Sequence, residues 1–103
     1  MNYAKAMRIL RAAKGISQQE LARKAEISKS LLSKIESGQR ELTNRNKSKI
    51  ARAMQIPISL LNILAIEAGY KKISKHDLEQ LGRTLLTINK QIESLKSEKE
   101  IQK

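Results

Sequence analysis

The segment from Gly15 to Gly38 constrains the fold of this chain more than any other part of it. It contains two short apolar stripes with helical spacing, and a serine that can cap a helix N-terminus stands before each of them. Ser17 lies three residues before Glu20, which is the spacing of a capping box, and Ser28 precedes the second stripe. Because only a few residues separate the stripes, the segment predicts two short helices joined by a tight turn.

Start and stop signals predict further helices on both sides of this pair. A first helix should end at Gly15, a fourth can be capped by Thr43, and Pro57 separates the fourth from a fifth that ends near Gly69. A long helical pattern then runs from about 75 to 98. The chain contains no Val, Trp or Phe and only two Tyr, so its apolar residues are those of packed helices. We therefore predict an all-α protein.

The long helical pattern sets the C-terminal part of the chain apart. We expect a domain over 1–70 and, over 71–103, a linker and one long helix whose polar end, 97–103, is frayed. Its Leu and Ile residues follow a heptad seam, which predicts a coiled coil that pairs two copies in a homodimer: Leu78, Leu81, Leu85, Ile88, Ile92 and Leu95. Three alternatives stay open: the seam folds back onto the first domain, it joins a larger bundle because Leu86 lies off the seam, or a different protein binds it. Gly82 indicates a close approach of a partner backbone or a hinge.

The charge balance points to a polyanionic partner. Lys and Arg number 21 against 10 acidic residues, which gives a formal net charge of +11. Residues 1–70 alone carry 13 of these cations and 5 acids. Nucleic acid is the usual partner of so basic a chain, and the alternative is a solvated basic surface without a partner.

Other classes of function find little support in the sequence. There is no cysteine for a disulfide, a thiolate metal site or a nucleophile, and a reducing cytoplasm is the expected location. No apolar stretch approaches the roughly 18 residues that span a bilayer. The single histidine, His76, stands in a capping box at the start of the long helix. We therefore expect no enzyme, no metal site, no cofactor and no membrane partner.

The segment from Gly15 to Gly38 also resembles the phage-repressor, Cro-like helix-turn-helix family. The resemblance rests on the motif GISQQELA, which begins at Gly15, and on SKSLLSKIESG, which begins at Ser28, and it covers about residues 7–66. It implies a five-helix lambda-repressor-like DNA-binding domain whose helix 28–37 enters the major groove of double-stranded DNA.

The resemblance also implies roles for single residues. The positions that read base edges are Lys29, Ser30, Ser33 and Lys34. The positions that contact phosphates are Gln18, Ser28, Ser37, Arg40 and Thr43, to which Arg45 is added as a cation that either contacts a phosphate or is solvated. Arg11 and Glu36 match an ion pair that ties the first helix to the third. Lys29 favours guanine where many relatives carry a glutamine that suits adenine, so their operator sequences do not transfer.

These features together predict a bacterial or phage transcriptional regulator. We expect a homodimer that binds an inverted-repeat operator, more as a repressor or autoregulator than as an activator. The alternative is an antitoxin or adaptor whose C-terminal helix binds a toxin, an antagonist or another partner protein.

Overall fold

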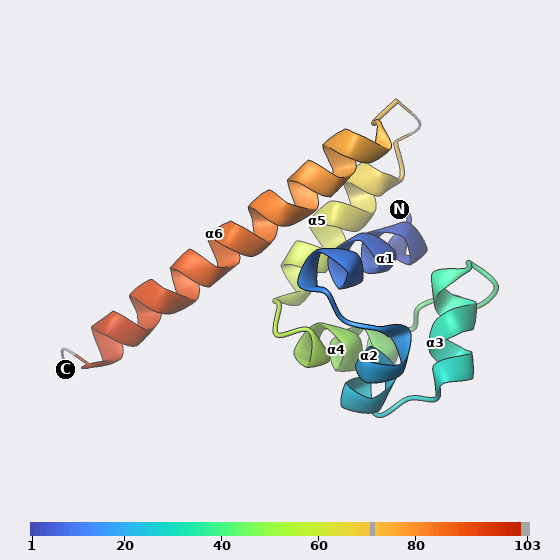
Figure 1. Ribbon diagram of the computed structural model, residues 1–103, viewed down its shortest axis with the longest axis horizontal. Coiled ribbons are helices and arrows are strands. Elements are labelled where there is room, and N and C mark those ends of the chain that lie inside the picture. Colours follow the sequence, from blue (N-terminus) through green and yellow to red (C-terminus); the bar gives the residue numbers. More distant parts are fainter. Residues whose placement is uncertain (71, 102–103) are drawn as a thin grey trace.

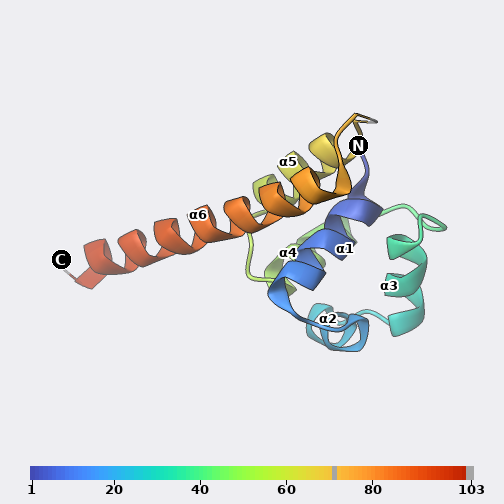
Figure 2. The ribbon, with the colours of Figure 1, turned by 45° about the horizontal axis from the view of Figure 1, so that its top comes forward.

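The computed structural model describes residues 1–70 and 72–101, and over these residues the chain forms six helices and no strand (Figure 1). They are α1 (Tyr3–Lys14), α2 (Gln18–Ala25), α3 (Lys29–Glu36), α4 (Asn44–Ala53), α5 (Ile58–Ala68) and α6 (Lys75–Ile101). Five short helices form the body of the molecule, and the C-terminal half of α6 extends away from it (Figures 1 and 2). The predicted all-α fold with one long C-terminal helix is confirmed.

The helix ends lie where the capping residues predict them. The hydroxyls of Ser17, Ser28 and Thr43 each accept a hydrogen bond from the backbone N–H three residues further on. Gly15 ends α1 with φ 68°, in the left-handed region that glycine adopts without strain. Glu26 takes the same conformation at the end of α2, with φ 57°, although it is not a glycine. The turn between α2 and α3 is therefore short and fixed.

The core draws its side chains from all six helices. α1 lies at the centre and packs against α3, α5 and α6, while α2 packs against α3 and α4. The largest fully buried apolar side chains are Met7, Leu10, Leu21, Leu32, Ile35, Ile50, Met54, Leu61, Leu64 and Leu78. Burial of such side chains contributes roughly 1.5–3 kcal/mol each before the cost in conformational entropy.

The first half of the predicted seam lies in this core rather than at a surface for a second copy. Leu78 is fully buried, so its assignment to pairing is wrong, and Leu81 and Leu85 also pack partly buried against the core of their own chain. Gly82 explains the contact, since a Cβ there would lie 3.0 Å from Ile9 Cγ2. The close approach at this glycine is therefore to the chain's own α1. The alternative that the seam folds back holds for its first half.

α6 also continues further than expected. The helix extends to Ile101, so the prediction that it frays from residue 97 is wrong as far as residue 101, and 102–103 lie outside the described residues. None of the helices in the described part of the chain is by itself long and apolar enough to cross a membrane, although α4 and α5, bent by 110°, pass that test of length and composition together.

Candidate nucleic-acid interface

One face of α3 is polar and open to solvent. Lys29, Ser30, Ser33 and Lys34 are all exposed, whereas Leu32 of the same helix is fully buried. At 3.6 residues per turn these four positions fall within an arc of about 140° around the helix axis, so the structure places the four predicted base-reading residues on one side of α3. Lysine and serine side chains on one helix face can donate to the acceptor atoms at base edges in a major groove.

The hydroxyl residues that flank α3 divide into two kinds. Ser28 and Thr43 are helix caps, and their oxygens accept from backbone N–H groups at 3.0 and 3.2 Å. Because a hydroxyl both accepts and donates, their protons stay available to a phosphate oxygen. The Ser37 hydroxyl instead donates to the Lys34 carbonyl at 3.0 Å. Ser37 must give up that hydrogen bond before it can donate to a phosphate.

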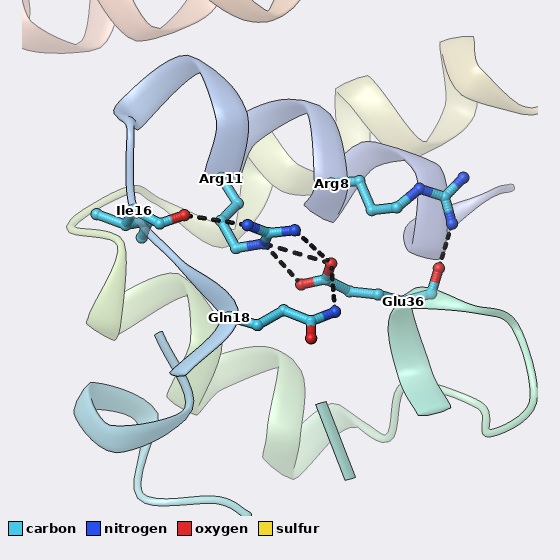
Figure 3. Close-up of polar contacts among 5 residues, drawn as sticks. All are labelled: Arg8, Arg11, Ile16, Gln18 and Glu36. Atoms are coloured by element: carbon cyan, nitrogen blue, oxygen red, sulfur yellow. Dashed lines mark hydrogen bonds and ion pairs between the residues drawn. The ribbon is translucent and has the colours of Figure 1, made fainter. Parts of the chain in front are cut away.

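Glu36 at the end of α3 is the centre of a polar cluster that ties α3 to α1 and α2 (Figure 3). Its side chain is only 2% exposed. Arg11 donates from Nε to Oε2 and from Nη2 to Oε1, both at 3.0 Å, so the ion pair expected from the resemblance is present. Gln18, expected to contact a phosphate, donates from Nε2 to Oε1 at 3.3 Å. A buried carboxylate is stable only with such partners, so the cluster fixes where α3 lies.

Arg8 belongs to the same cluster, although its role was not predicted from the sequence. Its guanidinium donates to the backbone carbonyl of Glu36, while Arg11 also donates from Nη1 to the Ile16 carbonyl at 3.1 Å (Figure 3). Arg8 precedes Arg11 by three residues and so lies on the same side of α1, which was the available signal. An arginine that donates to a backbone carbonyl needs no acidic partner side chain. No second residue in the sequence therefore indicates the contact.

The cations after α3 differ in what they contact. Arg40 and Arg45 are exposed, and neither forms an ion pair with any described residue. Lys47 instead lies 4.3 Å from the centre of the Tyr3 ring and donates to the Tyr3 hydroxyl at 2.9 Å. That hydroxyl donates to Asn62 Oδ1 at 2.6 Å, which links α1, α4 and α5. Lys47 is therefore held by the fold, whereas the two arginines are free to contact an anion.

Partial burial and neighbouring cations together affect titration on α1. The pKa of Lys14 is lowered, first by partial burial and then by repulsion from Lys24 and Lys90. An anion near this surface would relieve such repulsion. Among the side chains that the structure describes, those of 1–70 and 72–97, no three from His, Asp or Glu lie close enough together to hold a metal ion.

Comparison with known proteins gives one result. A family model described as Helix-turn-helix matches residues 7–61, which is more than half of the chain and includes α2, α3 and the polar cluster around Glu36. No curated protein and no solved structure is significantly similar to the chain.

Proposed function

The chain belongs to the helix-turn-helix family of DNA-binding transcription regulators, and on that premise we propose that it is a repressor that binds an inverted-repeat operator through α3. The observation that carries the proposal is the exposed face of α3, with two lysines and two serines, held in place by the buried ion pair behind it. A helix so fixed can enter the major groove without losing further conformational entropy.

The proposed contacts fall into two sets. Lys29, Ser30, Ser33 and Lys34 contact base edges and supply discrimination. The residues that position the chain on phosphates are Gln18, Ser28, Ser37, Arg40, Thr43 and Arg45, with Gln18 already oriented by its bond to Glu36. Arg40 and Arg45 contribute the dependence on salt because each releases counterions from the DNA.

We also propose that two copies pair through the C-terminal half of α6. Ile88, Ile92 and Leu95 follow the heptad spacing and are 46%, 45% and 60% exposed. The second half of the seam is therefore not buried against its own chain. Such an exposed apolar stripe on a helix surface favours a partner. A second copy is the partner that an inverted repeat requires, since its half-sites lie about 34 Å apart on one side of the duplex. In this proposal the first half of α6 belongs with residues 1–70, and the dimerisation element begins near residue 88.

The proposed function predicts that the chain selects one duplex sequence from a random pool. We expect repeated selection to enrich an inverted repeat whose half-site centres are 10–10.5 base pairs apart, or a multiple of that. Binding to the selected duplex should withstand random competitor DNA and fall steeply as salt rises, since each neutralised phosphate adds about 0.9 to the logarithmic slope. Equal affinity for selected and random duplexes would contradict sequence-specific regulation.

The proposed dimer makes a separate prediction. The double substitution Ile88→Lys with Ile92→Lys should turn a dimer into a monomer at micromolar concentration, measured by sedimentation equilibrium, because charged groups would face each other in the seam. Both side chains are already exposed, so the midpoint of urea unfolding of the monomer should change little. Ser94→Lys is the matched control on another side of α6 and should stay dimeric.

The alternative partner for this stripe is a different protein, as in an antitoxin or adaptor. A wild-type chain that sediments as a monomer at high concentration, yet keeps its selected binding to DNA, would support that alternative and contradict the homodimer. In either case we propose a bacterial or phage cytoplasm as its location, because the proposed operator is there.

A further inference from the structure

A cleft of about 600 Å³ lies between α1 and α6, away from the exposed face of α3. Ile9 and Ala12 contribute apolar surface to it, while five of its lining residues are cations: Lys5, Arg8, Arg11, Lys75 and Arg83. Glu79 is the single acid among the lining residues. The cleft thus combines an apolar wall with a net positive charge, and its volume is within the range of roughly 300–1,000 Å³ that small-molecule sites have.

Most of the positive charge in the cleft is not neutralised by the protein. Among the described residues neither Lys5 nor Arg83 forms an ion pair, and Lys75 Nζ is 4.0 Å from Glu79 Oε1, at the limit of one. Arg8 donates to the Glu36 carbonyl and to no carboxylate. Cations held together in this way repel one another, so an anion bound among them lowers the electrostatic free energy of the folded chain.

We propose that this cleft binds a small phosphate monoester with an apolar body, and that the bound ester weakens the binding of α3 to DNA. Several cations around one cleft suit a dianionic head better than a single carboxylate, and Arg side chains bind phosphate oxygens with two parallel hydrogen bonds. The apolar body would lie on Ile9 and Ala12. The second half of the proposal rests on the proposed function of α3.

Arg8 and Arg11 provide the connection between the two sites. Both line the cleft, and both also hold Glu36, through its carbonyl and its carboxylate respectively (Figure 3). A phosphate dianion accepts a stronger hydrogen bond from a guanidinium than a neutral carbonyl does, so it draws Arg8 away from the end of α3. The last turn of α3 then loses a contact that fixes its position. By thermodynamic linkage, bound DNA lowers the affinity for the ester by the same factor by which the ester lowers the affinity for DNA.

The cleft itself is tested without DNA, on the full-length chain labelled with ¹⁵N. Hexyl phosphate should cause saturable shifts in amides of α1 and the first half of α6, and smaller shifts in the last turn of α3, where Arg8 contacts the Glu36 carbonyl. Arg83→Gln should raise the dissociation constant about tenfold, the loss expected for one charge-assisted hydrogen bond. Arg52→Gln removes an exposed cation on α4, outside the cleft, and should leave the dissociation constant unchanged.

Hexanol and inorganic phosphate, which each lack one half of the ligand, should bind at least tenfold more weakly. Shifts that spread over all surface cations, that do not saturate, or that Arg83→Gln leaves unchanged overturn the site.

The connection to α3 is tested on the selected duplex. Saturating hexyl phosphate should weaken DNA binding at least fivefold in the wild-type chain at constant ionic strength, relative to inorganic phosphate, and should have less effect on Arg83→Gln. If the ester binds the cleft and the affinity for DNA does not fall, the coupling is overturned and the site stands. If the chain selects no duplex at all, the proposed function fails, and the titration without DNA still decides the site.

Discussion

The substitution Glu36→Ala is expected to lower the free energy of unfolding by about 3 kcal/mol, toward the lower end of the range for breaking a buried ion pair. Glu36 is 2% exposed and Arg11 22%, so the arginine that remains keeps some access to water. Three hydrogen bonds within 3.3 Å from Arg11 and one from Gln18 would be lost together. Since a small domain has only about 5–15 kcal/mol of stability, urea unfolding would detect this loss clearly.

Two further variants separate this interpretation from simpler ones. Glu20→Gln removes an exposed ion pair with Lys24, 3.2 Å long, and should change the free energy of unfolding by less than about 1 kcal/mol. Glu36→Leu combined with Arg11→Met replaces the pair by apolar side chains and should recover most of the loss, because no buried charge stays unpaired. If Glu36→Ala were no more harmful than Glu20→Gln, the cluster would not hold α3 in place.

The positions of the helices could be predicted from the sequence because their ends are local. Ser17, Ser28 and Thr43 cap helices by bonds to backbone three residues away, and Gly15 adopts its left-handed conformation in place. Each of these interactions lies within a few residues of chain, so the pattern of residue types determines it. The polar face of α3 follows from the same helical periodicity once its buried stripe is known.

The role of α6 could not be derived in the same way, because a heptad seam does not specify its partner. Leu78 and Ile92 occupy the same kind of seam position, yet Leu78 is fully buried in its own chain and Ile92 is 45% exposed. The difference comes from where α6 crosses α1 near Gly82, which depends on the tertiary packing of α1 and α5. The role of Arg8 could not be predicted for a related reason. Arg8 donates to a backbone carbonyl, which a residue of any type at that position would supply.

The second large effect is expected on DNA binding, where Lys29→Ala and Arg40→Gln should act differently. If Lys29 donates to guanine in each half-site, its removal costs about 1–3 kcal/mol per half-site, so a dimer should lose about 30-fold or more in affinity for the selected duplex. Affinity for random DNA should change much less, because one cation among many is lost. Arg40 is exposed in the loop before α4 and is proposed to contact a phosphate. Arg40→Gln should therefore weaken binding to selected and random duplexes by similar factors.

The dependence on salt distinguishes these two roles without knowledge of the operator. Arg40→Gln should lower the slope of log affinity against log salt by about 0.9 per half-site, or about 1.8 for a dimer. Lys29→Ala should relax the preference at one base pair of each half-site when the selection from random duplexes is repeated. Because both side chains are exposed, neither substitution should shift the midpoint of urea unfolding appreciably, which separates lost contacts from lost structure. If Lys29→Ala and Arg40→Gln gave the same loss on both duplexes, Lys29 would contact the backbone and the discrimination would have to come from Ser30, Ser33 and Lys34.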